Sequence, residues 1–555
     1  MPFVAERDMN ANDELLSSTA PASLYPRCLS LRTKLLRIRV FANYFSTLSN
    51  DSQQSSDPVG QLWDLFSYGA PLCYIFDQLP SERGFKKLNN STFDQKQYDS
   101  NPDLMRRRAL VLFAMQIRMP IVKQEIPGCE PFTLTDLWDR SSTDGLLKVI
   151  NTVEAIVDRF PQYFFEETPS SSDMNVSLES SKSDLPAENI VNIITELIET
   201  ERKYVRDLQS TLICSTALSE ANIVDQDEIQ LLFPELEKLI DFQIKFLVGL
   251  ENIAGLPWQE QRWGQHFLEN EDGFTIYMAY GFNYTKAFAV VPTIEQNIGP
   301  FQQMINDLGG LGMLLVRPIS RLCKYSLLLD CLVKQCSPSI YAHYSELQCG
   351  ADAAKHFVDR LNEAQRLGYN EHIVDGLRSG VQDWKDCSLD NFGELLLDDI
   401  IVATKFGIEQ EYHVYLFKCI IIFCRTKQNR KPAQGGKSAP LPRLRKTQGT
   451  PLVLKGRILW RDVTHVISAP AQTSETVSSR PVFPLCIWWK GDKGLDSSTL
   501  HCRTEGQMRK WEEMMNHCIK SVPGIAQDSE TETIYSAEED EFVILTRSPR
   551  TATTD

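Results

Sequence analysis

Residues 311–334, LGMLLVRPISRLCKYSLLLDCLVK, restrict the fold more than any other stretch of the chain. With about 100° of rotation per residue in a helix, one mostly apolar side collects Leu315, Ile319, Leu322, Ser326, Leu329 and Val333. The opposite side collects Arg317, Lys324 and Leu328, with Ser320 and Arg321 beside them. The apolar side predicts a helix packed into a helical core. The other side combines cations with an exposed leucine, which fits either a solvated surface or a protein-binding surface.

A second helix is predicted at residues 189–211, NIVNIITELIETERKYVRDLQST. The same geometry aligns on one side Ile190, Ile194, Leu197, Glu201, Val205 and Leu208. Glu201 therefore belongs to the packed side, where a carboxylate needs an ion pair or hydrogen bonds. Glu196 lies well off this side and is expected to point outward, either as an ordinary surface acid or as part of a binding site.

The size and charge of the chain exclude several functional classes. Its 555 residues suggest about three to four domains. The net charge, 57 − 73 = −16, argues against a nucleic acid as partner. The 14 cysteines and 8 histidines form no ligand-like cluster, so we expect no disulfide framework, no metal and no cofactor. The N-terminus lacks an apolar signal core and the longest apolar run, 419–424, is too short to span a bilayer, which predicts a soluble cytoplasmic protein.

Changes of pattern along the chain predict a multidomain, mainly α protein. The predicted segments are a flexible N-terminus at 1–23, a small helical domain at 24–166, a serine-rich linker at 167–186, an elongated helical bundle at 187–375, a small β-barrel capped by a C-terminal helix at 376–522, and an acidic disordered tail at 523–555. The barrel carries a basic insert at 425–446, with eight basic residues and no acid. This insert is expected to be a solvated loop that is also suited to docking on an anionic membrane.

Motifs for bond-making catalysis are missing from the sequence. Residues 435–438, GGKS, resemble the end of a phosphate-binding loop, but that motif requires glycine where this chain has Lys431. The signatures of serine hydrolases, zinc proteases and protein kinases do not occur.

Three motifs, in order, resemble the Dbl-homology domain of Rho-family guanine nucleotide exchange factors. They are ELIETERKYVRDL at 196–208, LLVRPISRLCKYSLLLDCL at 314–332, and RLNEAQ at 360–365. The strands GELLLDDIIVAT and EYHVYLFKCIIIFC, with the helix that contains Trp511, resemble a pleckstrin-homology domain. DPVGQLWDLFSYGAPLCYIFDQL resembles a calponin-homology-type domain. This domain order, covering residues 24–520, is similar to that of the fungal cell-division-cycle polarity exchange factors.

The resemblance implies an exchange factor that releases GDP from a Rho-family GTPase controlling cell polarity and the actin cytoskeleton. In that family an exposed acid meets the first switch of the GTPase, and it matches Glu196. The cations of the third motif match Arg317 and Lys324, and the asparagine of the last helix matches Asn362. Such contacts reshape the switch loops and weaken magnesium and phosphate binding, so GDP leaves and GTP replaces it. The predicted GTPase-binding residues are Glu196, Arg317, Ser320, Arg321, Lys324, Leu328 and Asn362.

Two departures from the family pattern keep an alternative open. The family usually has glutamine at Ser320 and proline at Ser326, and Ser320 shortens a side chain at the edge of the functional face. Ser320, together with the absence of the family's C-terminal Phox-and-Bem-type domain, motivates the alternative of a catalytically weak protein that binds a GTPase or acts as an adaptor at the cortical membrane, whereas Ser326 is expected to be a local packing change.

Further partners follow from the resemblance and from the basic residues. The family implies recruitment to the cell cortex, a polarity scaffold and heterotrimeric G-protein subunits as partners. Its scaffold-binding Phox-and-Bem-type domain has no counterpart in the last thirty or so residues, which are too few for a domain. An anionic membrane is expected to contact Lys405, Arg425, Lys427, Arg430, Lys431, Arg443, Arg445 and Lys446.

Overall fold

The fold is taken from a computed structural model, which describes residues 23–38, 41–48, 57–88, 101–138, 140, 142–165, 187–385, 387–405, 408–426, 451–470, 481–491 and 494–521. The chain divides into two compact units, Met1–His372 and Ile373–Asp555. The first unit is helical, and the second contains the strands. The predicted multidomain, mainly α fold class is confirmed, whereas the exact domain bounds stay predictions.

The first unit begins with a group of short helices. Their bounds are α2 Leu24–Leu36, α3 Phe41–Leu48, α4 Pro58–Ser67, α5 Ala70–Asp77, α7 Pro102–Ile117, α8 Pro120–Glu125, α9 Leu134–Trp138 and α10 Thr143–Arg159. Local sequence fixes several starts, because the side chains of Asp57, Asn101 and Ser142 accept hydrogen bonds from backbone N–H groups in the first turns of α4, α7 and α10. Their apolar sides meet in one core, which includes Phe66, Phe76 and Phe113.

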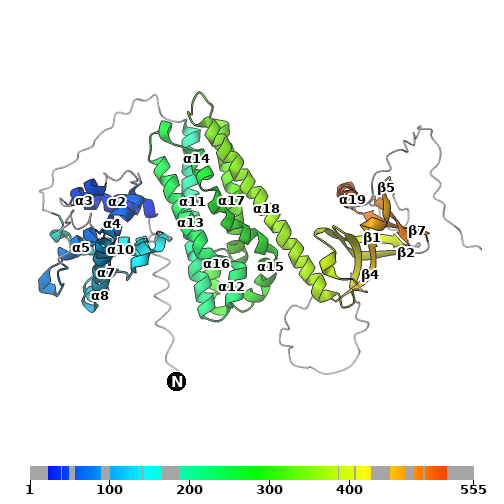
Figure 1. Ribbon diagram of the computed structural model, residues 1–555, viewed down its shortest axis with the longest axis horizontal. Coiled ribbons are helices and arrows are strands. Elements are labelled where there is room, and N and C mark those ends of the chain that lie inside the picture. Colours follow the sequence, from blue (N-terminus) through cyan, green and yellow to red (C-terminus); the bar gives the residue numbers. More distant parts are fainter. Residues whose placement is uncertain are drawn as a thin grey trace, which may run out of the picture. The chain divides into compact units, whose positions relative to one another are not determined.

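Longer helices form the rest of the first unit and lie side by side as a bundle (Figure 1). Their bounds are α11 Glu188–Glu220, α12 Gln226–Leu232, α13 Leu236–Ala254, α14 Trp263–Glu269, α15 Tyr277–Glu295, α16 Gln302–Asp307, α17 Leu311–Gln335 and α18 Tyr344–Gly380. The two helices predicted first correspond to α11 and α17. Helix α11 runs nine residues beyond the predicted end at 211, because Cys214, Ser215 and Leu218 continue its buried side.

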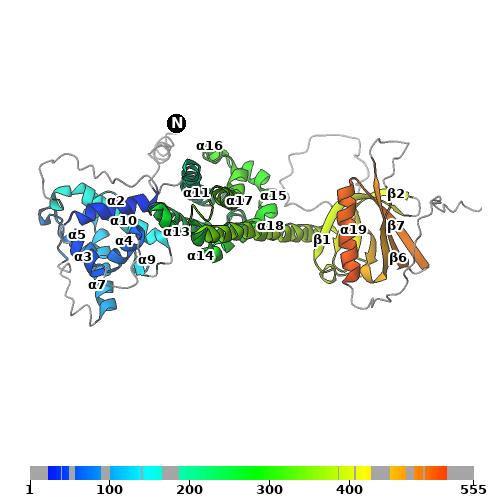
Figure 2. The same cartoon turned by 90° about the horizontal axis from the view of Figure 1, so that it is seen from above.

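The second unit is a seven-stranded antiparallel sheet with one helix packed on it (Figure 2). The bounds are β1 Leu395–Lys405, β2 Ile408–Phe417, β3 Ile420–Thr426, β4 Leu452–Leu459, β5 Val463–Ser468, β6 Phe483–Gly491, β7 Gly494–Cys502 and α19 Glu505–Lys520. The strand order is β4-β3-β2-β1-β7-β6-β5. Met508, Trp511 and Met515 of α19 join the core with residues from all seven strands, so the predicted strands closed by one helix are confirmed.

The longest apolar run of the chain is explained by burial on both faces of this sheet. Alternate residues Ile421 and Phe423 of β3 face the core beneath α19. The other alternating set, Ile420, Ile422 and Cys424, faces a second core that includes Leu377 and Val381. A strand buried on both faces reads as continuously apolar. The segment EYHVYLFKCIIIFC, which the sequence presents as one apolar run, is therefore a hairpin of β2 and β3. Strand β7 is not evident from the sequence because it is rich in Ser and Thr and only partly buried.

The described helices include none that is both long and apolar enough to cross a membrane.

Candidate functional site

Helix α17 buries the predicted side only in part: Leu315, Leu322 and Leu329 are buried as predicted, but the buried side extends beyond them in one direction. Its buried side includes Leu314, Pro318, Arg321, Tyr325, Leu328 and Leu332. The exposed side is a stripe at helical spacing, formed by Met313, Ser320, Lys324, Leu327 and Cys331. The observed core side is thus rotated by roughly 70° from the predicted one. Ser320 and Lys324 are exposed as expected, but the predicted exposure of Leu328 and Arg321 is wrong: they are 9% and 4% exposed.

Arg321 is buried because it forms an ion pair with Glu201 of α11. The Arg321 Nε donates to Glu201 Oε2 at 2.8 Å, and Nη2 also donates to this oxygen. The two side chains are 3% and 0% exposed. Burial by itself lowers the pKa of Arg321, but the Glu201 charge, Tyr325 and the hydrogen bonds to both side chains together raise this pKa overall. The prediction that Glu201 lies paired on the packed side is confirmed.

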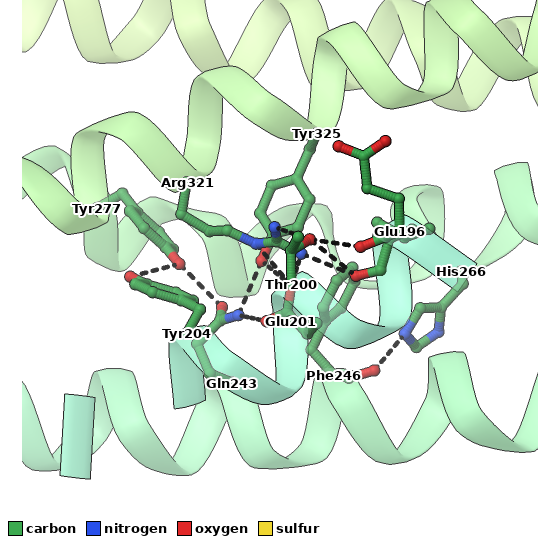
Figure 3. A network of polar contacts seen from close by, with 11 residues as sticks. Glu196, Thr200, Glu201, Tyr204, Gln243, Phe246, His266, Tyr277, Arg321 and Tyr325 are labelled. Carbon is green, nitrogen blue, oxygen red and sulfur yellow. Dashed lines mark hydrogen bonds and ion pairs between the residues drawn. The ribbon is translucent and has the colours of Figure 1, made fainter. Parts of the chain in front are cut away.

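Further polar side chains complete the hydrogen bonding of Glu201 (Figure 3). The Tyr325 hydroxyl donates to Glu201 Oε2 at 2.8 Å, and Gln243 Nε2 of α13 donates to Glu201 Oε1. The Tyr277 hydroxyl of α15 lies within hydrogen-bond distance of two acceptors, Gln243 Oε1 at 3.0 Å and the Tyr204 oxygen at 3.2 Å, and its single proton serves one of them at a time. Burial raises the pKa of all three tyrosines well above the ordinary value, so their hydroxyls stay protonated, and those of Tyr277 and Tyr325 serve as donors.

The buried pair also fixes the turn of α11 that carries Glu196. Arg321 Nη1 donates to Thr200 Oγ1 at 2.7 Å, and Nη2 donates to the Leu197 carbonyl at 3.2 Å. The Thr200 hydroxyl in turn donates to the Glu196 carbonyl at 2.6 Å. The Glu196 side chain is exposed and points away from the network, as predicted (Figure 3). Arg321 thus holds the backbone beneath the exposed carboxylate of Glu196.

Arg317 is partly buried, with 21% of its side chain exposed, and is engaged within the protein. Its Nη2 donates to the Leu308 carbonyl, and its Nε lies 3.8 Å from Asp207 Oδ2 of α11. These contacts tie the start of α17 to α11. The structure therefore places Arg317 at the edge of the predicted surface, between the exposed stripe and the core.

The helix directions bring Glu196, Lys324 and Asn362 to one level of the bundle. Helices α11 and α17 are antiparallel, because Arg317 meets Asp207 while Arg321, one turn later, meets Glu201 and Leu197. One further turn along α17 reaches Lys324, which lies at the level of Glu196 on α11. Exposed charges from two neighbouring helices therefore face the same solvent region.

Helix α18 supplies the third residue at this level. It returns antiparallel to α17 after a short connection, and Lys355 Nζ lies 2.9 Å from Asp330 Oδ1. Asn362 is seven residues after Lys355, and Cys323, which precedes Lys324, is seven residues before Asp330. Because α17 and α18 are antiparallel, equal steps from the Lys355–Asp330 pair place Asn362 at the level of Lys324. Asn362 is exposed. We name the exposed residues Glu196, Ser320, Lys324, Leu327 and Asn362 the three-helix face.

The three-helix face carries charges that are not neutralised within the protein. In the part of the chain that the structure describes, neither Glu196 nor Lys324 forms an ion pair. Leu327 is 63% exposed and was missed by the sequence reasoning. The available signal was the run 327–329: three consecutive leucines cannot all lie on the buried side of one helix. An acid, a cation, an amide and an apolar side chain together suit recognition of a protein surface.

The residues predicted to contact a membrane are mostly outside the described part of the chain. Lys427, Arg430, Lys431, Arg443, Arg445 and Lys446 lie there. Lys405 belongs to β1, where only its backbone is described. Arg425 is half-buried on β3, and its Nη1 donates to Gln410 Oε1 of β2 at 2.9 Å. Among the described residues, no three His, Cys, Asp or Glu side chains are grouped as a metal site would require.

Three family models match successive parts of the chain. "CDC24 Calponin" matches residues 57–157, "RhoGEF domain" matches 193–362, and "Pleckstrin homology domain" matches 390–515. The RhoGEF match spans every residue of the three-helix face, from Glu196 to Asn362.

Curated relatives match different shares of the chain. The chain is 28% identical to "Rho guanine nucleotide exchange factor scd1" of Schizosaccharomyces pombe over 91% of this chain and 57% of that protein. It is 30% identical to "Cell division control protein 24" of Saccharomyces cerevisiae over 66% of this chain and 42% of that protein. It is also 28% identical to the mouse "Phosphatidylinositol 3,4,5-trisphosphate-dependent Rac exchanger 1 protein" over 48% of this chain and 17% of that protein. The chain thus spans about half the length of the first two relatives, and the resemblance predicted from the sequence is confirmed.

Proposed function

We propose that this chain is a guanine nucleotide exchange factor that releases GDP from a Rho-family GTPase acting in cell polarity and actin organisation. The observation that carries the proposal is the three-helix face: Glu196, Lys324 and Asn362 lie exposed at one level of three adjacent helices. The name of the Schizosaccharomyces pombe relative, Rho guanine nucleotide exchange factor scd1, supports the same class of activity and substrate, and that of the Saccharomyces cerevisiae relative, Cell division control protein 24, supports a role in cell division.

The proposed mechanism needs binding energy and no bond-making chemistry. A protein that binds the nucleotide-free GTPase more tightly than the GDP-bound form shifts the GTPase toward the empty state. Glu196 offers a carboxylate to N–H or O–H donors of a switch loop, and Lys324 offers an ammonium group to acceptors. Both belong to helices cross-linked by Arg321, so little backbone freedom remains to be lost on binding. The GTPase switch loops, which are not held in this way, are the parts that change shape.

The test is the release of fluorescent GDP from purified Rho-, Rac- and polarity-class GTPases with catalytic amounts of the full chain. Accelerated release from at least one GTPase is expected. Glu196→Ala and Asn362→Ala should each slow this release at least about 30-fold, the effect of losing a binding hot spot of about 2 kcal/mol. Lys203→Ala, at an exposed position of α11 outside the face, is the matched control. The proposal fails if no GTPase responds, or if both variants match the wild type.

A catalytically weak GTPase-binding adaptor is the second candidate, and the exposed Ser320 on the three-helix face favours it. An adaptor would bind nucleotide-free GTPase without faster GDP release. Ser320→Gln lengthens the side chain at that position and should raise the release rate if the short side chain limits activity. An unchanged rate in a weak wild type would place the limitation elsewhere.

Recruitment to the cell cortex is proposed to involve the basic residues 425–446, with a polarity scaffold and heterotrimeric G-protein subunits as further partners. Eight basic residues without an acid support electrostatic attraction to an anionic leaflet. Sedimentation with anionic vesicles, comparing the full chain with one lacking residues 425–446, tests the membrane part. Equal binding by both chains would exclude this segment.

A further inference from the structure

Helix α7 in the N-terminal group of helices is apolar on two opposite sides. Ala109, Leu110, Phe113 and Ile117 form its buried side. Leu104, Val111 and Met115 are nevertheless 60%, 43% and 62% exposed, and Met119, just past the helix end, is 40% exposed. An ordinary surface helix has an apolar side against the core and a polar side in water. A second apolar side on α7 therefore calls for a second non-aqueous environment.

The exposed apolar residues are aligned, and arginines flank them. With about 100° per residue, Leu104, Val111 and Met115 lie within about 20° of one line along the helix. Arg107, Arg108 and Arg118 are exposed and lie within about 60° of the same line, on both of its sides. Asp103, the acid of the first turn, falls outside this range. We name the residues Leu104, Arg107, Arg108, Val111, Met115 and Arg118 the α7 stripe.

The arginines of the α7 stripe keep their charge available. Arg107 stacks over the ring of Trp138 at 5.0 Å, and Arg118 Nη2 donates to the Phe132 carbonyl at 3.2 Å. Within the described ranges, none of the three arginines is paired with an acid. The chain as a whole carries a net charge of −16, so this local cluster of cations is opposite in sign to the net charge of the chain. Electrostatic attraction to a negatively charged surface is thereby concentrated on this side of α7.

We propose that the α7 stripe binds the surface of an anionic lipid bilayer, with α7 lying in the interface plane. A helix that docks there places a row of apolar side chains at the boundary of the acyl chains, with cations along its flanks. Arginine side chains are long enough to lie along the apolar row while their guanidinium groups reach lipid phosphates. A bilayer accepts such a convex helix without a complementary groove, whereas a protein partner would have to provide one. The site is separate from the three-helix face and from residues 425–446, and it does not depend on exchange activity.

The test is sedimentation of the full chain with vesicles of phosphatidylcholine alone or mixed with phosphatidylserine. Val111→Ser/Met115→Ser should lower binding to the mixed vesicles at least about tenfold, since two apolar side chains no longer enter the interface. Arg108→Gln should lower it about fivefold, the effect expected for one basic residue at an anionic surface. The matched controls are Leu29→Ser/Leu36→Ser and Arg159→Gln, which change exposed residues of the same domain outside the stripe. Both controls should bind like the wild type.

Two results would overturn the proposal. One is wild-type binding by both stripe variants, which would leave a protein partner as the occupant of the stripe. The other is an equal loss in the controls, which would indicate a non-specific effect. Thermal unfolding should be unchanged in every variant, because the altered side chains are exposed. GDP release measured in solution without vesicles should also be unchanged, so failure of the membrane site and failure of the exchange function are distinguishable.

Discussion

Two glutamates five residues apart on α11 occupy opposite environments. Glu196 is exposed and has no ion-pair partner among the described residues, whereas Glu201 is buried and paired with Arg321. Helix α17 repeats the contrast with its exposed Lys324 and its buried Arg321. The same residue types therefore serve two purposes in adjacent layers. The buried layer fixes the helices relative to one another, and the exposed layer is left free to bind.

The largest effect is expected from breaking the buried layer. Arg321→Met should lower the free energy of unfolding by about 3–5 kcal/mol, because it leaves the Glu201 carboxylate buried without its counter-charge. Lys324→Met, one turn away on the exposed side, should change stability by less than about 0.5 kcal/mol. Urea unfolding of the full chain, followed through the helical signal, measures both. Similar stability losses in the two variants would remove the proposed distinction between the layers.

Adjacent leucines sharpen the comparison without any charge. Leu328→Ala should cost about 2–5 kcal/mol of stability because it opens a cavity in the core. Leu327→Ala should leave stability within about 0.5 kcal/mol but should slow GDP release, since Leu327 is exposed on the three-helix face. The free energy of unfolding and the rate of GDP release, both measured for each of the two variants, show which leucine is in the core and which is on the binding face. The α17 orientation described above would be contradicted if Leu327→Ala proved to be the more destabilising change.

A smaller effect is expected from pH acting on His266 of α14, elsewhere in the same bundle. His266 stacks on Phe246 at 4.5 Å between centroids, and burial lowers its pKa below the ordinary value of 6.5. The unfolded chain then binds more protons than the folded one, so this residue's contribution to stability is present above about pH 6.5 and is lost as the pH falls below it. Unfolding measured between pH 7.5 and pH 5 should show a shallower loss of stability for His266→Gln than for the wild type. If stability fell with pH at the same rate in both proteins, His266 would not contribute to the pH dependence of stability.

Helical periodicity in the sequence was enough to predict the fold class, the outward direction of Glu196 and the pairing of Glu201. It placed Leu315, Leu322 and Leu329 of α17 correctly in the core but misplaced the edge of the buried side, because a helical wheel treats an arginine as polar, while Arg321 is buried through a partner 120 residues away in the sequence. Because Arg321 was assigned to the exposed side, the predicted outer face of α17 was rotated about the helix axis. This predicted face included Leu328 in place of Leu327. The sequence pattern likewise gave no sign of Gln243 and Tyr277, whose burial depends on hydrogen bonds between separate helices.

The most direct test pairs the isosteric changes Glu196→Gln and Glu201→Gln, measuring both GDP release and the free energy of unfolding for each. Glu196→Gln should slow release while leaving stability unchanged, because it removes a charge that only a bound GTPase meets. Glu201→Gln should lower stability because it leaves the Arg321 guanidinium buried without a counter-charge. The account would be contradicted if Glu196→Gln destabilised the fold as much as Glu201→Gln, or if Glu196→Gln released GDP at the wild-type rate.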